Sequence, residues 1–378
     1  MTTPLPHHRS DGASDAPALL LGPSLGTSLA LWDAQVPALA RDFQVVRWDL
    51  PGHGGSAADL IAAGATVADL GRLVLDLADA LGLDRFAYAG VSLGGAVGSW
   101  LAAENPERIT ALALICSSAH FGGAEPWRER AAFVRAKGDQ AMAELAGSAP
   151  ARWFTDGFAA PDRLIQDQRT ADPAAYAACC DALAAFDLRG SLARITAPTL
   201  VLAGREDRAT PPPHSRELAD GIPGSTLIEL PGAAHLAPVE QPGAVLDALR
   251  THLLADRHSA GMAVRRAVLG DAHVDRAVAR TTDFTADFQD FITRYAWGEI
   301  WTRPGLDRRT RSCITLTALV AGGHHNELAM HVRAALRNGL TPDEIKEVLL
   351  QSAVYCGVPA ANSAFAVADA VLQEEASA

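Results

Sequence analysis

Residues 86–94 read FAYAGVSLG, and this stretch decides the architecture of the first half of the chain. An apolar run ends at Gly90, and helical spacing begins after Ser92. Glycines at positions 90 and 94 permit the tight turn and the strained serine backbone that such a junction needs. The stretch therefore predicts a buried strand, a sharp turn and a helix, with Ser92 at the turn as a candidate nucleophile.

The same rhythm extends on both sides of this turn, through residues 18–255. Short apolar runs alternate with stretches of helical spacing, an order typical of βαβ units and a parallel sheet. The runs that we expect to form strands are ALLLG, FQVVRWDL, RFAYAGVS, ITALALICSS, PTLVLAG and STLIEL. Residues 119–190 have helical spacing instead, and we interpret them as a helical cap inserted over one edge of the sheet.

The pattern changes after Leu254. Residues 255–261, ADRHSAG, are mostly small and polar, and everything beyond them has helical spacing without a convincing strand. The clearest local signal is TPDE at residues 341–344, a capping box with proline at the first helical position. We therefore predict an α/β domain over residues 1–255 and a separate all-α domain over residues 256–378.

A serine hydroxyl needs a base to activate it and an acid to orient that base. Asp207 follows the apolar run PTLVLA, and His235 follows STLIEL. Both positions fall at the carboxyl ends of predicted strands, where an open α/β sheet builds its site. The chain order Ser, Asp, His therefore predicts a catalytic triad of Ser92, Asp207 and His235, with Glu206 as the weaker alternative to Asp207.

The oxyanion formed during attack on a carbonyl needs two backbone N–H donors. The amide of Leu93, directly after the nucleophile, is the first candidate. The second is the amide of Leu25, in the glycine-containing loop after the first long strand. His53 lies in another turn-rich loop, and we interpret it as a structural residue.

Composition excludes several other classes of protein. The formal charge of −12 includes no basic run, which argues against nucleic acid as a partner. The chain has 5 cysteines and no C-x-x-C motif, so we expect reduced thiols and no structural zinc. No stretch approaches about 20 uninterrupted apolar residues, so we expect a cytoplasmic protein without a membrane segment.

Three segments of the first half, GPSLGTSLALWDAQ, VVRWDLPGHGGS and GVSLGG, carry a family resemblance. Residues 18–255 resemble the α/β-hydrolase superfamily and, within it, the 3-oxoadipate enol-lactonases. This resemblance implies hydrolysis of a small, acidic enol lactone. Because an arginine fork fits a carboxylate, Trp127 and Arg130 in the cap are the candidate substrate-binding residues. The family starts with a two-strand hairpin, whereas the residues before Ala18 are mostly polar, so we expect an abbreviated sheet edge.

The second half carries the segments YAWGEIWTRPGLDRRTRSCITLTALVAGG and LRNGLTPDEIKEVLLQSAVYCGVPAANSAF. These resemble the carboxymuconolactone decarboxylases, all-helical relatives of the alkyl-hydroperoxidase D group. The peroxidase relatives carry a redox C-x-x-C, which is missing here, so thiol redox chemistry is excluded. Glu327 and His331 stand at i and i+4 on a predicted helix, where both can reach one substrate group.

For the decarboxylation that this resemblance implies, His331 is the candidate proton donor and Glu327 its orienting partner. His324, Arg303 and Tyr355 are secondary candidates. The chemistry requires no cofactor, because a conjugated lactone carbonyl accepts the electrons that the departing carboxylate leaves behind. We expect no metal, since no two histidines in this stretch stand at i and i+4.

The two resemblances name consecutive reactions. Together they imply a bifunctional enzyme of the protocatechuate branch of the β-ketoadipate pathway, which decarboxylates 4-carboxymuconolactone and hydrolyses the resulting enol-lactone to 3-oxoadipate. The alternative is a single-activity lactonase or carboxylesterase with a non-catalytic helical domain for oligomerisation. In both cases the expected partners are carboxylated lactones and further copies of the chain, joined through the helical domain.

Overall fold

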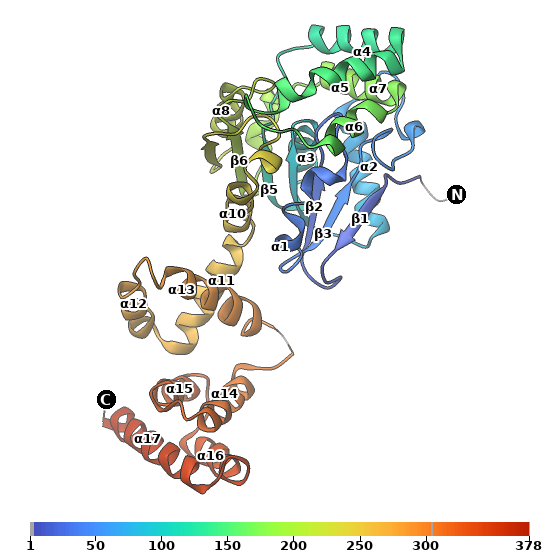
Figure 1. The fold of residues 1–378 in the computed structure, drawn as a ribbon. Coiled ribbons are helices and arrows are strands. Elements are labelled where there is room, and N and C mark those ends of the chain that lie inside the picture. The colour runs from blue at the N-terminus through green and yellow to red at the C-terminus, as the bar shows by residue number, and fades with distance from the viewer. Residues whose placement is uncertain (1–3, 304, 378) are drawn as a thin grey trace. The chain divides into compact units, whose positions relative to one another are not determined.

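A computed structural model describes residues 4–303 and 305–377 of the chain (Figure 1). The chain divides into two compact units, residues 1–253 and residues 254–378. The first unit contains a β-sheet with helices around it, and the described part of the second unit is helical. The prediction of an α/β half followed by an all-helical half is therefore confirmed.

The first unit is built on a seven-stranded sheet with the order β1-β3-β2-β4-β5-β6-β7. The strands are β1 (His8–Asp11), β2 (Ala18–Gly22), β3 (Gln44–Trp48), β4 (Phe86–Val91), β5 (Ile109–Ile115), β6 (Thr199–Gly204) and β7 (Thr226–Leu230). All neighbouring strands are parallel except β1, which pairs antiparallel with β3. Strands β2, β4 and β6 are buried along their whole length, as expected where helices cover both faces of a parallel sheet.

The polar residues before Ala18 contribute the edge strand β1. The register pairs His8 with Trp48 and Asp11 with Val45. Arg47 is only 5% exposed. Its guanidinium donates hydrogen bonds to the carboxylates of Asp11, at 3.0 Å, and Asp33, at 2.5 Å. The edge is short, as expected, and the ion pair between Asp11 and Arg47 ties the last residue of β1 to β3.

The helices of the first unit flank the sheet or form the cap. They are η1 (Leu29–Trp32), α1 (Val36–Leu39), η2 (Ala58–Leu60), α2 (Val67–Ala80), α3 (Leu93–Glu104), α4 (Glu125–Lys137), α5 (Asp139–Trp153), α6 (Asp162–Thr170), α7 (Pro173–Ala184), η3 (Arg189–Arg194), α8 (Pro212–Gly221), α9 (Ala237–Glu240) and α10 (Pro242–Leu253). Helices α4 to α7 lie between β5 and β6 in the chain, and Figure 1 shows them gathered over one end of the sheet. This is the segment interpreted from sequence as a cap.

The second unit consists of packed helices. They are α11 (Ala255–Leu269), α12 (Asp271–Ala279), α13 (Ala286–Ile292), the π-helix η4 (Thr293–Ile300), α14 (Arg308–Gly322), α15 (His325–Arg337), α16 (Pro342–Cys356) and α17 (Val358–Ser377). Buried residues of α14 to α17 form one core, which includes Leu316, Leu328, Leu349 and Ala364. The predicted capping box is present, because Thr341 and Glu344 bond to each other's backbone N–H.

Two details of the second unit differ from the sequence pattern. Residues 255–261, which look like a junction, belong to helix α11. A Cβ atom added at Gly261 would lie 2.1 Å from the Thr293 carbonyl oxygen, so this glycine permits close approach of α11 and η4 rather than a turn.

Among the described residues, no helix is long and apolar enough to cross a membrane.

Candidate functional site

Ser92 lies in the turn between β4 and α3, with backbone angles φ 54° and ψ −115°. The left-handed φ is sparsely populated by non-glycine residues and indicates a locally strained backbone. A Cβ atom at Gly90 would lie 2.2 Å from the Gly94 carbonyl oxygen, and one at Gly94 would lie 2.7 Å from that of Pro23. The two glycines are therefore required by backbone contact on both sides of the serine.

Neighbouring strands hold the turn in place. The Ser92 amide donates to the Ile115 carbonyl at 3.0 Å, and the Ser117 hydroxyl donates to the Ser92 carbonyl at 2.8 Å. The Gly94 amide donates to the Pro23 carbonyl at 3.1 Å, which ties the start of α3 to the loop after β2. These bonds fix the direction in which the serine side chain points.

Asp207 and His235 are in contact. The Asp207 Oδ2 atom lies 3.0 Å from His235 Nδ1, and both residues are 4% exposed. Thr210 supports the pair, because its Oγ1 atom lies 2.8 Å from Asp207 Oδ2 and 3.3 Å from His235 Nδ1. The structure thus brings together the predicted acid and base, which are 28 residues apart in sequence.

The pKa of the Asp207 carboxyl is lowered although the group is buried. Burial acts to raise the pKa, but the charge and hydrogen bond of His235 and two hydrogen bonds from Thr210 outweigh it. An ionised Asp207 holds the proton of the imidazole on Nδ1 and leaves Nε2 free to act as a base. Glu206 lies outside this pair, and its carboxylate accepts the backbone N–H groups of Gly232 and Ala233.

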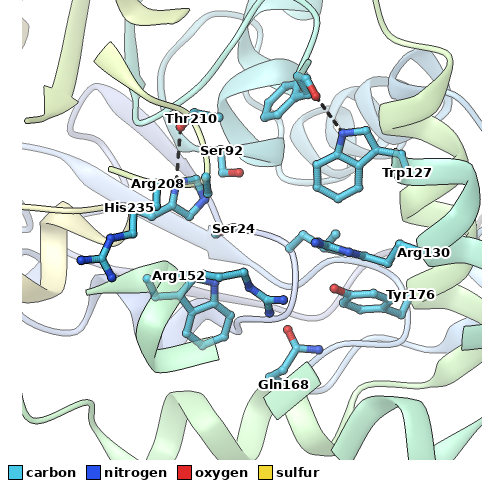
Figure 2. A pocket seen from close by; sticks show the side chains of 14 residues that line it. Ser24, Ser92, Trp127, Arg130, Arg152, Gln168, Tyr176, Arg208, Thr210 and His235 are labelled. Atoms are coloured by element: carbon cyan, nitrogen blue, oxygen red, sulfur yellow. Dashed lines mark hydrogen bonds between the residues drawn. The ribbon is translucent and has the colours of Figure 1, made fainter. Parts of the chain in front are cut away.

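Ser92 and His235 line the same cavity, of about 210 Å³ (Figure 2). Among the described residues, no hydrogen bond joins the Ser92 hydroxyl to the His235 ring. Leu25 also lines the cavity, and Leu93 is the first residue of α3. In the described part of the chain neither the Leu25 nor the Leu93 amide donates to another group, so both N–H groups are available to an oxyanion.

The cap supplies the opposite wall of the cavity. Trp127 donates from its indole Nε1 to the Phe121 carbonyl at 3.0 Å, and the Arg130 guanidinium lies 4.7 Å from the centre of the Trp127 ring. Both residues line the cavity that holds Ser92, as Figure 2 shows. The two cap residues proposed from sequence are therefore placed at the site.

Three further polar residues of this wall are absent from the sequence prediction: Arg152, Gln168 and Tyr176. They come from α5, α6 and α7, and they meet only because these helices pack together. Burial, followed by the charge of Arg130, lowers the pKa of Arg152, whose guanidinium donates to the Leu145 carbonyl at 3.3 Å. No motif marks these residues, since each looks like an ordinary polar position on a helix.

The cavity is rich in positive charge and in unused donors. Arg130 and Arg152 have no carboxylate partner among the described residues, whereas Arg208, also in the wall, pairs with Asp156 at 2.9 Å. Gln168 is 1% exposed, and its Nε2 atom has no hydrogen-bond partner in the described structure. A small molecule with a carboxylate would satisfy these donors.

His53 is fully buried outside this wall. Its Nδ1 atom lies 2.9 Å from the Pro51 carbonyl, and its ring stacks on Tyr176 with centroids 5.9 Å apart. Burial lowers the pKa of His53. These contacts tie His53 to its own loop and to a cap helix, and its structural role stays a prediction.

In the second unit, α15 carries both Glu327 and His331. Burial, followed by the charge of His273, lowers the pKa of His331 to about 4, and Glu327 opposes this shift weakly. Glu327 is exposed, and in the described structure no hydrogen bond joins it to His331. Glu327 and His331 therefore interact through their charges without a hydrogen bond, and His273, which sequence reasoning missed, has the larger effect on the pKa of His331.

The secondary candidates of the second unit lie apart from His331. His324 is exposed and precedes the first turn of α15. Arg303 is exposed, and its carbonyl accepts a hydrogen bond from Arg311 at 3.0 Å. Tyr355 is 78% exposed on α16. Among the described residues, no interaction connects any of the three with His331, so the structure does not assemble them into one site.

Each of the two units matches a known protein family. Residues 17–242 match the family described as alpha/beta hydrolase fold, and residues 286–370 match the Carboxymuconolactone decarboxylase family. The chain belongs to the alpha/beta hydrolase fold family through its first unit and to the carboxymuconolactone decarboxylase family through its second. It thus joins a hydrolase-family domain and a decarboxylase-family domain in one polypeptide.

Individual relatives of each unit are separate proteins. The chain is 36% identical to 3-oxoadipate enol-lactonase 2 of Acinetobacter baylyi over 238 residues, which is 62% of this chain and 87% of that protein. It is 48% identical to 4-carboxymuconolactone decarboxylase of the same organism over 118 residues, 31% of this chain and 88% of that protein. Among solved structures, the enol-lactonase of Burkholderia xenovorans aligns with a TM-score of 0.61 and 36% identity, covering 65% of this chain and 95% of that one.

Proposed function

We propose that this chain is a bifunctional enzyme that decarboxylates 4-carboxymuconolactone and hydrolyses the resulting enol-lactone to 3-oxoadipate, in the protocatechuate branch of the β-ketoadipate pathway. One observation carries the proposal: a single chain joins a relative of an enol-lactonase to a relative of a carboxymuconolactone decarboxylase. The two relatives are named for consecutive reactions. The arginine-lined cavity around Ser92 supports a carboxylated substrate for the second reaction.

Hydrolysis proceeds by acyl transfer in the first unit. The Ser92 hydroxyl attacks the lactone carbonyl while His235 Nε2 takes its proton, and Asp207 stabilises the imidazolium that forms. The amides of Leu25 and Leu93 stabilise the oxyanion, and the enol oxygen leaves with the proton from His235. Water activated by His235 then cleaves the acyl-enzyme. Arg130 and Arg152 hold the substrate carboxylate at the cap side of the cavity.

Decarboxylation takes place in the second unit. The bond between the ring carbon and its carboxylate breaks, and the electron pair moves through the conjugated double bond to the lactone carbonyl oxygen. A proton delivered to carbon then gives the enol-lactone. His331 is the proposed donor. Burial and, after it, the charge of His273 lower its pKa to about 4, and a substrate carboxylate bound nearby would favour the protonated imidazole.

Exposed apolar residues support assembly of the second unit with further copies of the chain. Within the described structure, all large apolar side chains that are strongly exposed belong to this unit: Val278, Phe284, Phe288, Phe291, Tyr295, Ile300, Leu306, Ile314, Leu350, Val354, Tyr355 and Val358. Such a surface is unusual for a monomer and is typical of a homo-oligomer interface. We therefore propose a homo-oligomer joined through the helical unit.

The same surface favours a second candidate function. If the helical unit served only for assembly, the protein would be a lactonase or carboxylesterase without decarboxylase activity. Such an esterase would cleave neutral aryl esters as well as carboxylated lactones. The two candidates differ in one product, because only the bifunctional enzyme releases CO2.

The deciding experiment follows CO2 and 3-oxoadipate together after 4-carboxymuconolactone is added to purified wild-type protein and to the Ser92→Ala variant. We expect the wild type to form both products in equal amounts. Ser92→Ala should still release CO2 but accumulate the enol-lactone. Absence of CO2 from the wild type would reject the bifunctional proposal and favour the esterase with an assembly domain.

A further inference from the structure

The second unit contains a cavity of about 390 Å³ where α11 meets α12 and both face α15. Its volume falls within the range of sites for small ligands. Four of its lining side chains are basic, namely His273, Arg276, Arg333 and Arg337. This concentration of positive charge is unexpected in a chain with a formal charge of −12.

The acidic groups near the cavity leave part of this charge unpaired. Arg333 pairs with Glu374 and Glu375 of α17. The one acidic lining residue, Asp271, lies 3.1 Å from Arg266, which does not line the cavity. Asp275, next to Arg276 in sequence, pairs with the same Arg266 at 2.8 Å. Among the described residues none of these carboxylates forms an ion pair with Arg276 or His273.

Arg276 and Arg337 are the unpaired guanidinium groups. In the described structure Arg276 has no acidic partner and is exposed at the cavity wall. Arg337 donates through Nη1 to the Leu269 carbonyl at 3.0 Å, and it has no ion pair among the described residues. Each guanidinium therefore keeps free N–H donors for an anion.

Further positive charge lies behind the cavity wall. Arg265 is 5% exposed and donates to Thr293 Oγ1 at 3.1 Å and to Gln289 Oε1 at 3.0 Å, both neutral acceptors. Burial, followed by the charges of Arg276, Arg265 and Arg337, lowers the pKa of His273. Three guanidinium groups thus act on one imidazole, and among the described residues none of the groups that shift its pKa is a carboxylate.

The cavity lies beside the proposed proton donor. His331 is on α15 between lining residues Met330 and Arg333, and the charge of His273 acts on it directly. Burial is the larger cause of the lowered pKa of His331, and a carboxylate held by Arg276 and Arg337 would offset the second cause, the positive charge of His273. The binding of an acidic substrate and the supply of a proton would then be coupled.

We propose that Arg276, Arg337 and His273 form the carboxylate-binding site of the decarboxylase, and that a carboxylate of the lactone substrate occupies this cavity. This inference rests on the proposed function, because it assigns the binding part of that same site. Arg303 and His324, the substrate-binding candidates suggested by sequence, line neither this cavity nor another described cavity.

The test uses the full-length chain labelled with ¹⁵N-histidine and adipate as a stable dicarboxylate probe. The ring resonances of His273, assigned by their loss in His273→Gln, report on this cavity alone, even if adipate also enters the first unit. The variant is Arg276→Gln, and the matched control is Arg280→Gln, an exposed arginine one turn further along that does not line the cavity. The diol 1,6-hexanediol serves as a probe without carboxylates.

We expect adipate to shift the His273 resonances in the wild type and in Arg280→Gln, and hexanediol to leave them unchanged. Arg276→Gln should weaken adipate binding at least about tenfold, because a charge-assisted hydrogen-bonding partner is lost. The KM for CO2 release from 4-carboxymuconolactone should rise by a similar factor in Arg276→Gln, with a smaller change in kcat.

Two results separate the inference from the proposed function. If the wild type releases CO2 but Arg276→Gln keeps its KM and adipate leaves His273 unmoved, the carboxylate site is wrong and the decarboxylase stands. If the wild type releases no CO2 but adipate shifts His273 in an Arg276-dependent way, the decarboxylase proposal fails and the anion site stands.

Discussion

The guanidinium of Arg130 lies over the ring of Trp127, 4.7 Å from its centre, so a cation held against an aromatic face forms one wall of the cavity around Ser92. This arrangement fixes the direction of a long side chain that would otherwise be solvated. Arg152 enters the same cavity from a different cap helix.

Loss of the Arg152 charge should impair binding of carboxylated lactones selectively. Arg152→Gln should raise the KM for the enol-lactone about 10- to 100-fold, because a charged hydrogen bond contributes about 1.5–3 kcal/mol. The KM for a neutral aryl acetate should change less than about threefold. Arg128→Gln, on the exposed side of α4, is the matched control and should leave both values unchanged. An equal loss for both substrates would reject a role in carboxylate binding.

The Asp207–His235 pair should be essential for hydrolysis only. Asp207→Asn should reduce kcat for lactone hydrolysis about 10³- to 10⁴-fold, because the imidazole loses its orienting carboxylate and its favoured tautomer. The rate of CO2 release from 4-carboxymuconolactone should stay at the wild-type level. Glu206→Gln tests the alternative acid, and a larger loss there than in Asp207→Asn would show that the acid was wrongly assigned.

The lowered pKa of His331 predicts how stability depends on pH. In the folded state the His331 imidazole has a pKa of about 4, against an ordinary value of 6.5. The unfolded chain therefore binds a proton on His331 more tightly than the folded protein does. Stability from this residue is complete above about pH 6.5 and is lost as the pH falls toward 4. Between pH 7 and pH 5 the loss amounts to about 2 kcal/mol.

Chemical denaturation of wild type and His331→Gln at both pH values measures this contribution. The free energy of unfolding should fall less steeply with acidification in the variant. His273, whose pKa is also lowered, is present in both proteins, so the comparison measures His331 together with its coupling to His273. Identical slopes for the two proteins would show that His331 is protonated equally in the folded and unfolded states.

The contact of Gly261 with η4 predicts a destabilising substitution. In Gly261→Ala the new methyl group would meet the Thr293 carbonyl oxygen at 2.1 Å, so α11 and η4 must separate, at a cost of about 1–3 kcal/mol. Gly147→Ala is the matched control, because Gly147 is helical and a Cβ atom there meets nothing within 4 Å. Thermal unfolding should show a lower midpoint for Gly261→Ala and an equal or higher midpoint for Gly147→Ala.

The sequence predicted those features that depend on residues close together in the chain. The turn at Ser92 is one, because Gly90, Gly94 and the flanking apolar strand all lie within 9 residues. The capping box at Thr341 is another. Asp207 and His235 could be placed as well, since the end of each strand in a parallel sheet reaches the same edge.

Residues that meet through packing could not be predicted in this way. Arg152 and Gln168 reach the first cavity only when α5 and α6 dock over the sheet. His273 approaches His331 because α12 folds back toward α15, and no spacing in the sequence records that contact. The helical state of residues 255–261 was obscured because Gly261 looks like a turn residue, while its role is to admit a neighbouring backbone.

The left-handed backbone of Ser92 has a consequence for evolution as well as for chemistry. A non-glycine residue in this conformation raises the free energy of the native state by about 1–3 kcal/mol. Glycine would relieve that strain, so Ser92→Gly should melt at a higher temperature than the wild type while losing lactone hydrolysis. Selection for thermal stability alone would favour glycine at position 92. A serine at this position is therefore explained by selection for catalytic activity.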